Sequence, residues 1–175
     1  MISCAVSILT TYAFSSSEKA SKFNNWDSIT SYFSSPPLEQ VAITNYSSEK
    51  WFEGARGYQE ALATSRKTGA PIFLYVHTDW CGYCKKFEKS LLVNANVNVA
   101  LSNFIKVKLN PEDGANEKLI HTSLGGGGYP SIYSKLPNTK KAIREKGPFT
   151  RKFSGWAMMS DNEFISLLAS ILNRS

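Results

Sequence analysis

Cys81 and Cys84 are separated by two residues in the stretch TDWCGYCKKFEK, residues 78–89. Such a pair can be a redox dithiol, half of a metal site, or two unrelated thiols one helical turn apart. A redox dithiol needs two sulfurs close enough to bond and one thiol with a lowered pKa. The first turn of a helix provides this, because its free backbone N–H groups and the helix dipole stabilise a thiolate. The function of the pair therefore depends on the elements on either side of it.

The flanking residues predict those elements. The run PIFLYVHT before the motif is apolar, aromatic and β-branched, as expected of a strand buried on both faces of a sheet. After the motif, Cys84, Phe87 or Glu88, and Leu91 follow the three-four spacing of one helix face. We therefore expect Cys81 to be the exposed nucleophile at the start of this helix, and Cys84 to be the shielded resolving thiol.

The immediate neighbours of the pair favour the same chemistry. Lys85 and Lys86 add positive charge that stabilises a thiolate, Trp80 can cover one side of the sulfurs, and Gly82 lets backbone or substrate come close. A bare Cys-x-x-Cys is a moderate signal. A strand, a tryptophan, Cys-Gly-x-Cys and an amphipathic helix together predict a working dithiol.

Zinc binding is the weaker alternative. The chain has three cysteines, Cys4, Cys81 and Cys84, and a single Cys-x-x-Cys, so a four-thiolate zinc site cannot close within one chain. His77 and His121 could in principle complete four ligands. However, His77 lies in an apolar strand-like run and His121 in an amphipathic one. We therefore expect no metal and no other cofactor.

Composition predicts one domain with an extension. The 175 residues are 42% hydrophobic and 13% aromatic, which is enough apolar surface to build a core. The net charge is +6, and seven basic residues but only one acid lie between Lys135 and Lys152. This stretch is expected to be a solvated loop face rather than a nucleic-acid site, because no nucleic-acid motif accompanies it.

The N-terminal part differs in composition from the rest. Residues 1–15 are mostly apolar, and the run is too short for a membrane span. Such a run is typical of the core of a secretory signal, although a basic n-region is missing here. The alternative is a disordered chain end. Residues 16–48 are rich in Ser, Asn and Thr and predict a linker or extension. The folded domain is then 49–175. We expect an extracytoplasmic location, periplasmic or secreted, and no stable membrane insertion.

The rest of the pattern alternates strands and helices and predicts an α/β fold with a central mixed sheet flanked by helices. Starting from the buried strand the order is βαβαββα. The expected helices are one within 51–69, one after the cysteines, one at 111–124 and one at 160–173. The expected strands are 71–78, 104–110, and an antiparallel pair formed by 129–135 and the region around 151–156. The last helix should be capped by Ser160 or Asp161 and should bury Phe164, Leu167, Leu168 and Ile171.

Three motifs in this order, DWCGYCKK, KLN at 108–110 and GGYPS, resemble those of the thioredoxin-fold thiol-disulfide oxidoreductases. The resemblance covers roughly residues 50–172. It implies that Cys81 attacks a substrate disulfide and that Cys84 resolves the mixed disulfide. It also implies that Tyr129 and a cis Pro130 form the backbone edge on which the substrate docks, beside Trp80.

The sequence departs from the family at three places. The family's buried acid, six residues before the first cysteine, is replaced by Tyr75, whereas Lys108 matches the family's partner lysine. Tyr75 and Lys108 are therefore the candidates for proton-transfer support. The Gly-Tyr dipeptide resembles that of bacterial periplasmic disulfide isomerases. The basic segment 137–150 is interpreted as an insertion between the last two strands, either a surface loop or a selector of partners.

Two functions remain open at this point. The first is an enzyme that acts on protein disulfides through Cys81 and Cys84, as a reductase or isomerase. Its partners would be protein substrates with thiols or disulfides and an unidentified redox partner, and the enzyme would be a monomer. The alternative is a binding or chaperone-like module of the same fold, in which the dithiol is regulatory.

Overall fold

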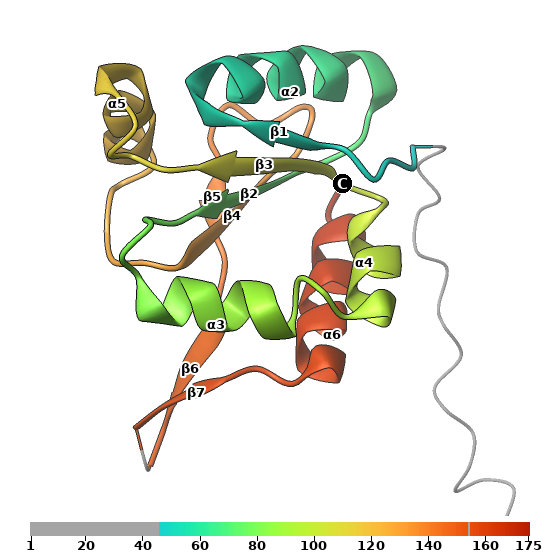
Figure 1. Cartoon of the computed structure of the whole chain (residues 1–175). Helices are drawn as coiled ribbons and strands as arrows, with labels where there is room; N and C mark the ends of the chain where they lie inside the picture. The colour runs from blue at the N-terminus through green and yellow to red at the C-terminus, as the bar shows by residue number, and fades with distance from the viewer. Residues whose placement is uncertain (1–45, 154) are drawn as a thin grey trace, which may run out of the picture. The chain divides into compact units, whose positions relative to one another are not determined.

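The computed structural model describes residues 46–153 and 155–175, so the predictions for residues 1–15 and for nearly all of 16–48 lie outside the described residues. The core of the fold is a five-stranded sheet (Figure 1). Its strands, in the order β1-β3-β2-β4-β5, are β1 (Trp51–Glu53), β3 (Ile105–Leu109), β2 (Ile72–Val76), β4 (Ser131–Lys135) and β5 (Ile143–Arg144).

The sheet is mixed, as predicted. Strand β3 runs parallel to both β1 and β2, whereas β4 runs antiparallel to β2 and to β5. Strand β2 is central and all five of its residues are buried, which explains its unbroken apolar sequence. The short segment after this buried central strand leads to Cys81 and α3, so β2 positions the cysteine motif.

Helices cover both faces of the sheet. They are α2 (Gly54–Thr68), α3 (Gly82–Ser90), α4 (Ala95–Leu101), α5 (Ala115–Ser123) and α6 (Asp161–Leu172). Figure 1 shows α2 and α5 on one side and α3, α4 and α6 on the other. The side chains of β2 alternate accordingly, since Ile72 and Leu74 pack in one apolar cluster and Phe73 and Tyr75 in the other. No helix among the residues described here is long and apolar enough to cross a membrane.

Helix α6 packs against the sheet and against α3, the helix that begins at the cysteine motif. Ser160 caps it in a capping box with Glu163, which confirms one of the two predicted caps. The ring of Phe164 packs edge-on against Phe73 and Phe87, with centroids 6.1 and 5.5 Å away. Because Phe87 belongs to α3, this aromatic cluster ties the helix of the cysteine motif to the sheet.

One strand pairing predicted from the sequence is wrong. Strand β4 pairs with the two-residue strand β5 rather than with the region around 151–156. That region instead folds back on itself as the hairpin of β6 (Phe149–Lys152) and β7 (Gly155–Met158), a separate two-stranded sheet. The region does form strands, as predicted, but they pair with each other within a few residues of chain. The predicted insertion 137–150 thus contains β5 and the start of β6.

Candidate functional site

Cys81 and Cys84 form a disulfide at the N-terminus of α3, with their Cα atoms 5.2 Å apart. Cys81 is the N-cap residue, and its Sγ accepts a hydrogen bond from the backbone N–H of Cys84 over 3.1 Å. The helix begins at Gly82, the next residue, and its first turn contains no acidic side chain. This geometry favours a thiolate on Cys81 when the pair is reduced, because a free helix N–H group and the dipole both point at the sulfur.

The expected exposure of Cys81 is not observed in this disulfide state. Cys81 is 4% exposed and Cys84 is 1% exposed, so both belong to the apolar core. The Cys81 sulfur is bonded to that of Cys84, and both side chains pack in the same apolar cluster. The exposed groups of the motif are its aromatic neighbours Trp80 and Tyr83, at 66% and 51%.

The loop between α5 and β4 lies beside the motif. The Tyr129–Pro130 peptide bond is cis, as the resemblance predicted. The ring of Tyr129 packs edge-on against Trp80 with centroids 6.0 Å apart, and Trp80 Nε1 donates to both carboxylate oxygens of Glu112 at 2.9 and 3.1 Å. The structure therefore brings together the three predicted substrate-binding residues. Sequence reasoning missed Glu112, which holds the Trp80 indole in place.

Tyr75 and Lys108 lie side by side, as the resemblance implied. Their Cα atoms are register partners in β2 and β3, so both side chains project from the same face of the sheet. Tyr75 is fully buried, and its hydroxyl has no hydrogen-bond partner among the described residues. Burial, and next the negative charge of Glu88, raise the pKa of Tyr75 well above its usual range. Tyr75 therefore stays protonated and cannot accept a proton from a thiol.

The buried lysine of β3 is Lys106 rather than Lys108. Burial lowers the pKa of Lys106, which is 1% exposed and donates to the backbone oxygen of Ser48. Lys108 is half-buried, and its Nζ lies 5.3 Å from the ring centroid of Trp51. The lysine of β3 whose pKa is lowered by burial is therefore Lys106, two residues before the predicted Lys108.

Glu88 adds a carboxylate that the sequence reading did not assign to the site. It projects from α3, one turn after Cys84, and lines a cavity of about 200 Å³ together with Trp51 and Lys108. Its spacing was ambiguous in the sequence, where either Phe87 or Glu88 fitted the buried face. Phe87 takes the core position and Glu88 lies half-buried at the edge.

The two histidines lie against different tyrosines. His77 stacks on Tyr75 with ring centroids 5.1 Å apart, and the His121 ring lies 5.4 Å from that of Tyr129. Burial, followed by the charge of Arg144, lowers the pKa of His121, so this imidazole is neutral at pH 7. Within 46–153 and 155–175, no group of three or more His, Cys, Asp and Glu side chains could hold a metal ion.

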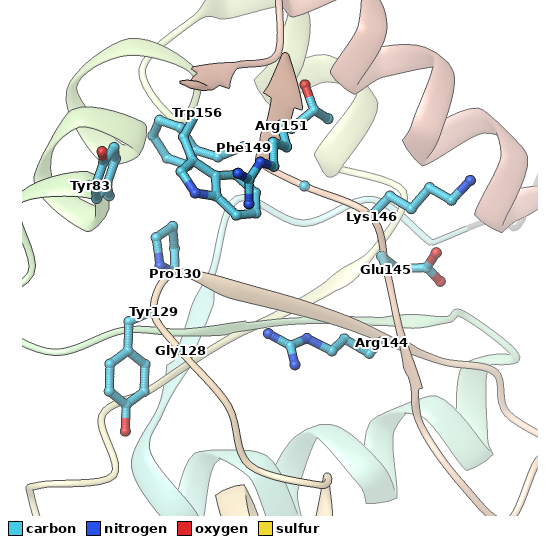
Figure 2. A pocket seen from close by; sticks show the side chains of 12 residues that line it. Tyr83, Gly128, Tyr129, Pro130, Arg144, Glu145, Lys146, Phe149, Arg151 and Trp156 are labelled. Atoms are coloured by element: carbon cyan, nitrogen blue, oxygen red, sulfur yellow. The ribbon is translucent and has the colours of Figure 1, made fainter. Parts of the chain in front are cut away.

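A cavity of about 620 Å³ opens beside the motif and extends under the β6–β7 hairpin (Figure 2). Tyr83 forms one wall, the Gly128–Pro130 segment lies at its base, and Phe149 and Trp156 cover it from the hairpin. The ring of Tyr83 contacts that of Phe149 edge-on, with centroids 4.9 Å apart. Tyr83, which lies between the two cysteines, and the basic segment that contains Arg144 and Arg151 therefore line the same cavity.

A thioredoxin-like family model matches residues 51–133 of the chain. Among solved structures, a DsbH oxidoreductase is similar with a TM-score of 0.57 and 18% identity, over 83% of this chain and 99% of that one. A thioredoxin from Thermus thermophilus is similar with a TM-score of 0.53 and 19% identity, over 70% of this chain and 85% of that one. The C-terminal domain of DsbD from Neisseria meningitidis, in its reduced form, is similar with a TM-score of 0.52 and 14% identity, over 69% of this chain and 98% of that one. These likenesses confirm the predicted fold.

Proposed function

We propose that this chain, which has a thioredoxin-like fold and matches a thioredoxin-like family model over residues 51–133, is a thiol-disulfide oxidoreductase that acts on protein disulfides through Cys81 and Cys84. The observation that carries the proposal is the Cys81–Cys84 disulfide at the N-terminus of α3, where Cys81 Sγ accepts the Cys84 N–H. A metal or cofactor is not needed for this exchange, which consists of sulfur attack alone.

In the reducing direction the pair starts as a thiolate on Cys81 and a thiol on Cys84. The Cys81 thiolate attacks one sulfur of the substrate disulfide and forms a mixed disulfide, and the first substrate sulfur leaves as a thiolate and takes up a proton. The cis Tyr129–Pro130 segment lies beside the motif through the Trp80–Tyr129 contact, and it supports the substrate backbone during this step.

Resolution completes the transfer of two electrons. Cys84 loses its proton to solvent and attacks the sulfur of Cys81, which forms the intramolecular disulfide and releases the second substrate thiolate. An external dithiol then restores the reduced pair. In an isomerase cycle, a different substrate thiolate instead attacks the substrate sulfur of the mixed disulfide. A new substrate disulfide forms, Cys81 leaves as a thiolate, and the Cys81/Cys84 pair ends the cycle reduced, as it began. Tyr75 takes no proton in either route, since its hydroxyl stays protonated.

Turnover of a disulfide-bonded protein tests the proposal. Wild type with dithiothreitol as the electron donor should reduce insulin faster than dithiothreitol alone, and Cys81→Ser should abolish this acceleration. A binding or chaperone-like module would bind an unfolded protein equally well with and without Cys81, and would not accelerate the reduction. The reduction potential of the pair then separates a reductase from an isomerase, because a more oxidising couple favours exchange over net reduction.

The proposal places this reaction in an extracytoplasmic compartment. The apolar sequence of residues 1–15 supports it, since such a run is typical of a secretory signal core. Cell fractionation of the full chain, probed with an antibody against the folded domain, would test the location. Recovery in the cytosolic fraction alone would contradict it.

A further inference from the structure

Resting on the proposed function, we infer that the cavity between the cysteine motif and the β6–β7 hairpin is a subsite for an acidic, extended segment of the protein substrate, next to the substrate's disulfide. The cavity of about 620 Å³ is within the range of ligand sites, about 300–1,000 Å³. It is lined both by Pro130 and by Tyr83, which lies between the two cysteines. A chain seated there would pass the reacting sulfurs.

The charges on the cavity wall are unbalanced. Arg144, Lys146 and Arg151 line it, and the one acid of the lining is Glu145. Glu145 is already engaged, because its Oε1 accepts hydrogen bonds from the Ser134 hydroxyl and from Arg174 Nη2. Among residues 46–153 and 155–175, no acidic side chain forms an ion pair with these three cations, and this charge complementarity favours acidic side chains in the occupant.

Arg144 is held in position for this role. Its Nη2 donates to Ser131 Oγ at 3.0 Å, directly after Pro130, and Figure 2 shows it pointing toward the Gly128 segment. The guanidinium also lies close against the backbone of Gly127, because a Cβ there would be 2.6 Å from Arg144 Nη1, and the φ of 121° at this position favours glycine. The remaining N–H groups of the guanidinium are available to a carboxylate.

The hairpin supplies the second cation and an apolar cover. Because side chains alternate along β6, Phe149 and Arg151 share one face of the hairpin, and Arg151 is the cross-strand partner of Trp156. Trp156 remains 61% exposed although it covers the cavity, as expected of an aromatic side chain without an occupant to bury it. Lys152 follows Arg151 on the opposite face, and it does not line the cavity.

Two disulfide-bonded peptides of the same length test the inference, with the disulfide flanked by Asp residues in one and by Lys residues in the other. With dithiothreitol as the donor, wild type should give a kcat/KM about 3- to 10-fold higher for the acidic peptide at low salt, and the preference should shrink at high salt. Arg151→Gln should lower this preference several-fold. The matched variant Lys152→Gln removes the same charge from the other face and should keep the preference.

Equal kcat/KM values for the two peptides in wild type would overturn the inference while leaving the proposed function intact. Equal losses of preference in Arg151→Gln and Lys152→Gln would also overturn it, because a general charge effect would then suffice. An oligonucleotide that protects Arg144 and Arg151 from chemical modification, when the acidic peptide does not, would assign the cavity to nucleic acid instead. Failure of wild type to accelerate the reduction of either peptide would refute the proposed function itself.

Discussion

The reactivity of Cys81 in the reduced protein follows from its position as the N-cap of α3. The Cys84 N–H that reaches Cys81 Sγ at 3.1 Å can donate to a thiolate. A hydrogen bond to a charged acceptor contributes about 1.5–3 kcal/mol, and the helix dipole adds about 0.3–1 kcal/mol. A thiolate favoured by about 2 kcal/mol, the lower end of that sum, is about 30-fold more abundant relative to the thiol. Since free cysteine is only a few per cent thiolate at neutral pH, about half of Cys81 should be ionised there.

The measurement is the rate of alkylation against pH in Cys84→Ser, whose second thiol is removed while the backbone donor stays. The profile should rise at lower pH than that of free cysteine. Adding Lys85→Glu, a charge change in the first turns of α3, should cut the thiolate-to-thiol ratio about 3-fold, and Lys89→Glu in its last turn should change it little. A profile that matches free cysteine, or equal shifts in the two charge variants, would refute this reasoning.

Other parts of the site and core give further tests. Tyr75→Phe should stabilise the protein by about 1 kcal/mol in urea denaturation, because a buried hydroxyl without a partner is removed, and disulfide exchange should continue. Tyr75→Asp, if folded by circular dichroism, should speed the resolution of a mixed disulfide by supplying a proton acceptor, and an unchanged rate would contradict this. Glu112→Ala should raise KM for a peptide disulfide several-fold by releasing Trp80, and Glu112→Gln should restore part of the loss. Phe164→Ala should cost about 3–5 kcal/mol of unfolding free energy, whereas the exposed Val99→Ala should change it by less than about 0.5 kcal/mol.

Elements that carry a full hydrophobic period were predictable from the sequence. Strand β2 is apolar along its whole length because it lies at the centre of the sheet. Helix α6 begins after the predicted cap Ser160 and buries Phe164, Leu168 and Ile171 of the predicted stripe, whereas Leu167 is half-buried. Strands β1 and β5 contain three and two residues, which is too few to show a period, and α4 contains only seven. Strand β1 depends on its pairing with β3, where Trp51 lies opposite Lys106, and β5 depends on its pairing with β4.

The chemistry of the site divides in the same way. The two cysteines and Pro130 could be found because their spacing and order are local properties of the sequence. The contact of Trp80 with Glu112 spans 32 residues, and that of Tyr83 with Phe149 joins α3 to the hairpin, so both arise only from the tertiary fold.

The central claim is that Cys81 attacks and Cys84 resolves, and trapping the intermediate tests it most directly. Reduced Cys84→Ser, mixed with a disulfide-bonded protein and quenched with acid, should accumulate a mixed disulfide that peptide mass spectrometry locates at Cys81. Wild type should accumulate much less of it, because Cys84 releases the substrate. If Cys84→Ser forms no mixed disulfide, or if Cys81→Ser forms one through Cys84 equally fast, the assignment of the nucleophile is contradicted.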